Sequence, residues 1–83
     1  SEGYLSLYSR AEVQFQAGNY RAAIDLYDKS LAINQNYEPA LFRKAMAYKA
    51  LGDTENANTF FAEVISRFPG TELARQAESE KTQ

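Results

Sequence analysis

The chain has 83 residues, enough for one small domain near the lower size limit for a stable core, and it contains neither cysteine nor histidine. Disulfides, thiolate zinc sites and histidine-based catalysis are therefore excluded. Nine basic and 11 acidic residues are interspersed along the chain, giving a formal charge of −2 without the clustered basic face that usually marks a nucleic-acid-binding domain.

The first half of the chain predicts a pair of helices. Apolar residues recur at helical spacing over about residues 4–17. Gly18 ends this helix, because glycine accepts the left-handed conformation found just past a helix C-terminus. Asn19 is expected to cap a second helix, over about residues 20–33, with its side-chain oxygen. The predicted inward stripe of that helix is Ala22, Ala23, Leu26, Tyr27, Ser30, Leu31 and Ile33.

The second half predicts another pair of helices. Pro39 falls in the first turn of a helix over about residues 38–51, where a missing N–H group is tolerated. Gly52 and Asp53 then repeat the glycine stop and the polar cap. The helix that follows covers about residues 54–68.

A shorter and more polar helix is expected at the end of the chain. Residues 69–70 are Pro-Gly, which ends the preceding helix, and Thr71 begins the last one. We expect this helix to fray after Ser79. The predicted organisation is all-α, with helix-turn-helix units at 4–37 and 38–70, a capping helix at 71–80 and a tail at 81–83.

The two helical units repeat each other at an offset of 34 residues, as Gly18 and Gly52 illustrate. The other matched pairs are Leu7 with Leu41, Ala11 with Ala45, Ala23 with Ala57, and Tyr27 with Phe61. A period of this size indicates a repeat array, in which each unit buries its apolar face on its neighbours. The alanines are expected to lie where paired helices cross closely.

These positions resemble the tetratricopeptide repeat (TPR), over about residues 4–80. The family pattern has a large and then a small residue in the first helix, a Gly-Asp/Asn-Tyr turn, and a small residue and then an aromatic one in the second. The chain departs from it at Gln14, where the family has tyrosine, and at Gln35, where it has proline. The resemblance implies an α-solenoid that acts as a protein-interaction scaffold rather than an enzyme.

A second, shorter resemblance concerns origin. Residues 68–77 are similar to repeat junctions of bacterial cell-envelope TPR proteins, which makes a bacterial envelope origin one expectation. The sequence leaves periplasm and cytoplasm equally open. Because the chain begins with Ser1 rather than methionine, we expect it to be a fragment of a longer protein. No apolar run approaches the roughly 18 residues of a membrane span, so direct membrane insertion is not expected.

The TPR resemblance also implies where a partner would bind, since the first helix of each repeat lines the concave face. The expected partner-binding residues are Leu5, Tyr8, Glu12, Phe15, Phe42, Arg43, Met46, Lys49 and Leu73, with Gln16 and Gln76 beside them. The aromatic residues and Met46 would contact the partner, Arg43 and Lys49 would meet a carboxylate, and Glu12 a base. An open alternative is that some of the apolar side chains pack against each other or under the last helix.

One ligand of the family can be tested by residue type. Chaperone-binding members hold a peptide carboxylate with lysine, asparagine and arginine. The matching places here hold Tyr8, Glu12, Arg43, Leu73 and Ala77. Only Arg43 has suitable chemistry, so a chaperone C-terminus is not the expected ligand.

The predicted function is therefore a protein–protein interaction module that binds a peptide or partner helix in a concave groove. Two alternatives remain: a homodimer that uses the same apolar surface, and an inert segment of a longer array. No cofactor, metal or nucleic acid is expected, and Asp25 and Asp28 are interpreted as part of a solvated helix face rather than a catalytic pair.

Overall fold

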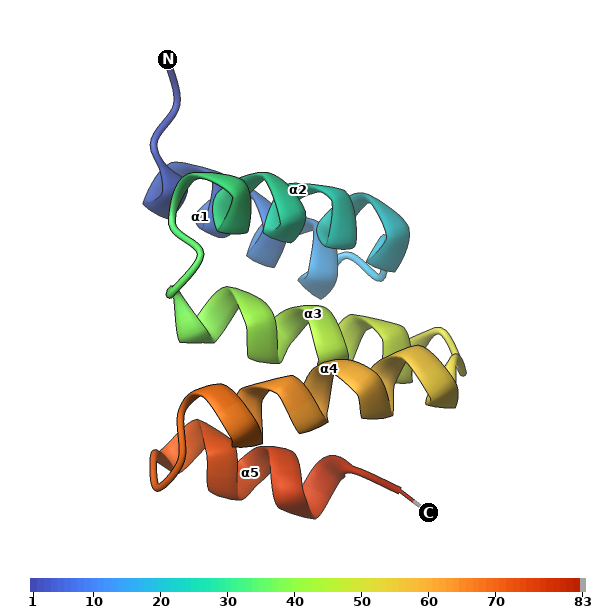
Figure 1. Ribbon diagram of the computed structural model, residues 1–83. Helices are drawn as coiled ribbons and strands as arrows, with labels where there is room; N and C mark the ends of the chain where they lie inside the picture. The colour runs from blue at the N-terminus through green and yellow to red at the C-terminus, as the bar shows by residue number, and fades with distance from the viewer. Residues whose placement is uncertain (83) are drawn as a thin grey trace.

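The computed structural model describes residues 1–82, which form five α-helices joined by short turns and contain no strand (Figure 1). The helices are α1 (Tyr4–Gln16), α2 (Tyr20–Ile33), α3 (Glu38–Ala50), α4 (Thr54–Arg67) and α5 (Glu72–Glu80). Each helix boundary lies within two residues of its prediction. The all-α class is confirmed.

Successive helices pack against each other, and α3 also contacts α5 directly. Figure 1 shows the result as a stack, with α1 and α2 at one end and α5 at the other. The described residues extend over 38 × 25 × 16 Å. The helix pairs α1–α2 and α3–α4 correspond to the two predicted repeats, while the division of the chain at 4–37, 38–70 and 71–80 stays a prediction.

The turn between the two helices of each pair follows the same local chemistry. Gly18 and Gly52 have φ angles of +81° and +82°, a region that a side chain would make strained. Asp53 then caps α4, because its carboxylate accepts from the backbone N–H of Asn56 at 3.2 Å. Thr71 caps α5 in the same way.

The expected side-chain cap at Asn19 is wrong. Asn19 occupies the N-cap position of α2, but its side chain makes no capping hydrogen bond. The side-chain amide instead donates to Gln14 at the end of α1, at 2.9 Å. The first turn of α2 therefore lacks the cap that Asp53 provides in α4.

The core is built on the predicted alanines. Ala11, Ala23 and Ala45 are 0% exposed and Ala57 is 2% exposed, which confirms that small residues lie at the crossings within each helix pair. Tyr27 fills the adjacent space in the first pair, and its repeat counterpart does so in the second. Small residues let the helix axes approach, and the large aromatic side chain occupies the wider gap beside them.

For two residues of α2, the prediction that they belong to the inward stripe is wrong. Ala22 and Ile33 are exposed, whereas Ile24, outside that stripe, is buried. The physical reason is that α2 packs on two sides, against α1 and against α3. The periodicity of α2 alone cannot show that Ile24 lies on the side of α2 that faces α3, where it lines the same small hollow as Tyr48.

The C-terminal end is held to the body of the molecule rather than frayed after Ser79. Lys49 donates to the side chain and to the backbone carbonyl of Glu80, each at 2.9 Å. The amide oxygen of Asn58 accepts from the backbone N–H of Thr82 at 3.0 Å. The helix therefore continues to Glu80. Gln83, in the predicted tail, lies outside the described residues.

Candidate partner-binding pocket

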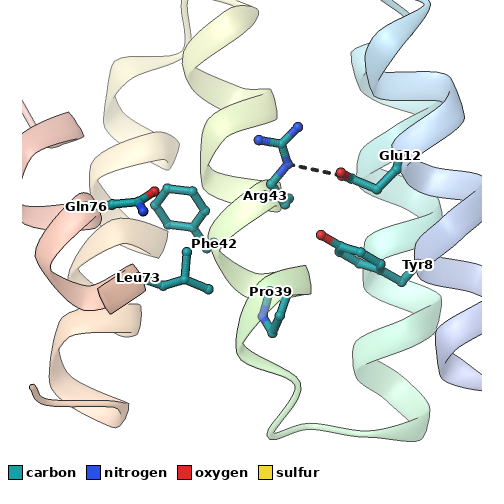
Figure 2. A pocket seen from close by; sticks show the side chains of 7 residues that line it. All are labelled: Tyr8, Glu12, Pro39, Phe42, Arg43, Leu73 and Gln76. Atoms are coloured by element: carbon teal, nitrogen blue, oxygen red, sulfur yellow. Dashed lines mark hydrogen bonds and ion pairs between the residues drawn. The ribbon is translucent and has the colours of Figure 1, made fainter. Parts of the chain in front are cut away.

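A pocket of about 270 Å³ opens between the first helices of successive pairs and α5 (Figure 2). Its walls come from Tyr8 and Glu12 of α1, Pro39, Phe42 and Arg43 of α3, and Leu73 and Gln76 of α5. The two positions in α1 are four residues apart and those in α5 three, and in α3 Phe42 and Arg43 follow Pro39 by three and four, so in each helix they share one face. Three segments far apart in the sequence thus share one hollow.

An ion pair crosses the pocket from α1 to α3. Arg43 donates from Nε to Oε1 of Glu12 at 3.0 Å, and the two side chains are 23% and 30% exposed. The buried hydroxyl of Tyr27 donates to the same carboxylate oxygen. The guanidinium carbon of Arg43 also lies 4.3 Å from the ring centroid of Phe15. Glu12 and Arg43 are therefore held in place by the protein itself.

The tyrosines of this network are neutral at ordinary pH. Burial, followed by the charge of Glu12, raises the pKa of Tyr8 to about 12. Burial and the hydrogen bond to Glu12 also raise the pKa of Tyr27. Burial by itself would lower the pKa of Arg43, but the hydrogen bond and charge of Glu12 outweigh it and leave that pKa raised. The pocket therefore presents a neutral phenol beside a charged pair.

Phe42 lines the pocket, but the expectation that its ring would be free for a partner is wrong. The side chain is only 4% exposed and belongs to the core formed by α3, α4 and α5. Its ring centroid lies 5.8 Å from that of Phe61. The cause is that α5 packs on α3 and covers the ring, which is the alternative that the sequence left open.

The two cations expected to meet a carboxylate are also already paired. Arg43 binds Glu12, and Lys49 binds Glu80 at 2.9 Å, outside the pocket lining. In each pair the partner lies 31 residues away in the sequence. Glu12 is in turn paired with Arg43, so its charge is balanced within the chain, and its contact with a base of the partner stays a prediction.

The remaining predicted residues divide by position. Tyr8 and Leu73 line the pocket, and their contact with a partner stays a prediction. Leu5 is 55% exposed and lies outside the lining. Phe15 is half-buried under Arg43, and Met46 packs partly buried against the core. Neither Phe15 nor Met46 is in the pocket wall.

Pro39 was not among the predicted site residues. It lies three and four positions before Phe42 and Arg43, so helical spacing from those two residues could have identified it. In the sequence, Pro39 indicated the start of a helix and not a binding residue.

The described part of the chain offers little other chemistry. Residues 1–82 contain no group of three or more acidic side chains placed to hold a metal ion. None of their helices combines the length and apolar character needed to cross a membrane. Asp28 binds Lys44 of α3 at 2.7 Å, so it serves the packing of α2 on α3.

Comparison with known families agrees with this geometry. The sequence model of the family described as the tetratricopeptide repeat matches residues 14–80. The chain belongs to the tetratricopeptide repeat family. The resemblance drawn from the repeat pattern is therefore confirmed. TPR domains mediate protein–protein interactions and are typically non-catalytic scaffolds.

Two curated proteins are similar in sequence to this chain. The chain is 33% identical over 69 residues to the tetratricopeptide repeat and J domain-containing co-chaperone DNJ1 of Fusarium oxysporum f. sp. lycopersici, covering 83% of this chain and 13% of the relative. It is 34% identical over 56 residues to human peptidyl-prolyl cis-trans isomerase FKBP4, covering 68% of this chain and 12% of the relative. The chain thus spans only a small part of either protein. Both relatives are eukaryotic, so they give no support to a bacterial cell-envelope origin.

Proposed function

We propose that this TPR domain binds a peptide or partner helix in the pocket between α1, α3 and α5. The observation that carries the proposal is the convergence of three helices on one open hollow with both apolar and polar walls. Leu73 supplies apolar surface, and Tyr8 and Gln76 supply groups that can form hydrogen bonds. Peptide-binding grooves commonly combine apolar anchor sites with a few polar groups that set orientation.

The size of the pocket supports a contact with part of a larger partner. Its volume of about 270 Å³ is just below the roughly 300–1,000 Å³ of sites that enclose a whole small molecule. A hollow of this size suits one or two side chains of a peptide, with the rest of the peptide lying along α1, α3 and α5. The pocket would then provide the anchor of a longer interface.

Self-association has less apolar surface to use than the sequence implied. Phe42 is buried, and Tyr8, Phe15 and Met46 are half-buried, so all four of these large apolar side chains are wholly or partly covered within one chain. A peptide from another protein is therefore better supported as the ligand of the pocket than a second copy of this chain.

A displayed library of peptides of about 12 residues would test the proposal. Enriched peptides would be titrated by calorimetry into the wild-type protein and two matched leucine variants. Leu73→Asn alters the pocket wall, whereas Leu5→Asn alters an exposed leucine outside it. We expect Leu73→Asn to weaken binding about tenfold or more and Leu5→Asn to leave it unchanged.

Thermal melts would confirm that both leucine variants are folded. The proposal would be overturned if no peptide were enriched, or if the enriched peptides responded to Leu5→Asn and not to Leu73→Asn. Light scattering on the same samples would detect a dimer and thereby reveal occupation by a second copy.

A further inference from the structure

Glu12 and Arg43 carry opposite charges on facing walls of the pocket. Among the described residues that line it, Arg43 is the one cation and Glu12 the one anion, so the formal charges of the lining cancel. The contact is made by Nε of Arg43 and Oε1 of Glu12. Figure 2 shows the two terminal nitrogens of Arg43 turned away from Glu12. The guanidinium therefore keeps donors for a further acceptor.

Glu12 likewise keeps an oxygen for a further donor. Both of its hydrogen bonds, from Arg43 and from the hydroxyl of Tyr27, end on Oε1. Within residues 1–82 its Oε2 accepts no hydrogen bond, and the side chain is 30% exposed. Within residues 1–82 the hydrogen bonds of this ion pair thus leave the terminal donors of Arg43 and one acceptor of Glu12 unused.

This arrangement affects charged and neutral ligands differently. A peptide carboxylate that approached Arg43 would also approach the carboxylate of Glu12, and two like charges in a half-buried site repel each other. A neutral amide has no such penalty. Its carbonyl oxygen can accept from Arg43 while its N–H donates to Glu12, so its dipole matches the orientation of the pair.

Resting on the proposed function, we propose that Glu12 is the specificity-determining residue of this pocket. It excludes peptide ends that carry a free carboxylate and selects an internal, uncharged peptide segment with an apolar side chain. Leu73 and the aromatic ring of Tyr8 would contact that side chain, while Arg43 and Glu12 would bind the adjacent backbone amide. The selected partner is thus a segment within a chain and not a chain terminus.

The neutral phenol of Tyr8 is consistent with this assignment. Its pKa is raised by burial and by the charge of Glu12, so at ordinary pH it adds no charge to the pocket. It can donate a hydrogen bond to a second carbonyl of the same segment.

The test compares two forms of one peptide, acetyl-Gly-Ser-Gly-Leu-Leu with a C-terminal carboxylate or with a C-terminal carboxamide. Each form is titrated into isotope-labelled protein, and the amide resonances of Leu73 and Gln76 report on the pocket. We expect the wild-type protein to bind the carboxamide at least about tenfold more tightly. In Glu12→Gln, the carboxylate form should gain about tenfold and the preference should disappear or reverse.

Glu12→Gln is a mild change, because its amide oxygen can still accept from Tyr27 and Arg43. Asp28→Asn is the matched control. It removes a carboxylate from an ion pair outside the pocket lining and changes the formal charge of the chain by the same amount, from −2 to −1. Asp28→Asn should therefore keep the wild-type preference, which separates a local effect from one of net charge.

The outcomes distinguish this inference from the proposed function. Equal binding of both forms to the wild-type protein would overturn the role of Glu12 and leave the pocket as a peptide site. So would an unchanged preference in Glu12→Gln. If neither form shifted the pocket resonances of either protein, the proposed function and this inference would both be overturned. The comparison on the wild-type protein needs no variant, so it decides the question even if Glu12→Gln is unstable.

Discussion

The hydroxyl of Tyr27, in the core of the first helix pair, donates a hydrogen bond to Glu12 in the wall of the pocket. This contact joins a structural side chain to a candidate binding residue 15 positions earlier in the chain. The packing of α1 on α2 therefore also fixes the carboxylate that pairs with Arg43. The stability of the fold and the charge of the pocket depend on the same group.

Replacing Tyr27 with phenylalanine tests this coupling. The ring would still fill its buried space, but Glu12 would lose a donor, and hydrogen bonds to charged groups contribute about 1.5–3 kcal/mol. We expect Tyr27→Phe to lower the free energy of unfolding by about 1–2 kcal/mol in urea titrations, since Arg43 still binds Glu12. Tyr20→Phe is the control, because the hydroxyl of Tyr20 makes no hydrogen bond within residues 1–82. Equal losses in the two variants would contradict the role of the Glu12 contact.

Alkaline pH should destabilise the domain through Tyr8. Its pKa is raised from 10.0 to about 12, so folding favours the neutral phenol. The corresponding stability is fully present below about pH 10 and is lost as the pH rises from there through about 12. Thermal melts across this range should show a falling melting temperature. Absorbance titration should show that Tyr8 ionises later than an exposed tyrosine, as should Tyr27 and Tyr37, whose pKa values burial also raises.

In Tyr8→Phe the alkaline loss should become smaller. It should not vanish, because the pKa of Tyr27 is raised in the same direction. A wild-type melting temperature that stays constant from pH 9 to 12 would contradict the assignment.

Two adjacent alanines of α2 offer a test of the helix crossing. Ala23 is 0% exposed against α1, whereas Ala22 is exposed. We expect Ala23→Leu to force the helices apart and lower the free energy of unfolding by about 1–3 kcal/mol, as overpacking commonly does. Ala22→Leu should change it by less than about 0.5 kcal/mol, because the larger side chain can remain in solvent. Similar losses at both positions would show that the crossing tolerates larger residues.

The ion pair of Lys49 with Glu80 should stabilise the end of α5 and contribute little to the stability of the whole domain. The two side chains are 41% and 36% exposed, and exposed ion pairs usually contribute about 0–1 kcal/mol. Lys49→Gln should therefore leave global stability nearly unchanged but speed hydrogen exchange in the last turn of α5. Lys29→Gln, on the exposed side of α2, is the control and should leave that exchange unaltered. Unchanged exchange in Lys49→Gln would show that α5 is held by its apolar contacts alone.

The sequence by itself determined the helices, the glycine stops and the repeat. Each depends on chemistry within a few residues, such as the left-handed conformation at Gly18 or the cap at Asp53. It also indicated which alanines are buried, because a repeat that recurs at 34 residues places equivalent positions in equivalent contacts. The prediction from local sequence failed at Asn19. Its side chain could have capped the first turn of α2, but its amide donates to Gln14 instead.

Only the tertiary structure decided the state of the pocket. The TPR resemblance placed Tyr8, Glu12, Arg43 and Leu73 on one face, but not the bond between Glu12 and Arg43. Nor could it show that α5 covers Phe42. Charge pairing and side-chain burial depend on how helices about 31 residues apart are stacked, and helical periodicity describes each helix alone. That is why the sequence indicated a groove with free charges, while the folded chain has a pocket whose charges already neutralise each other.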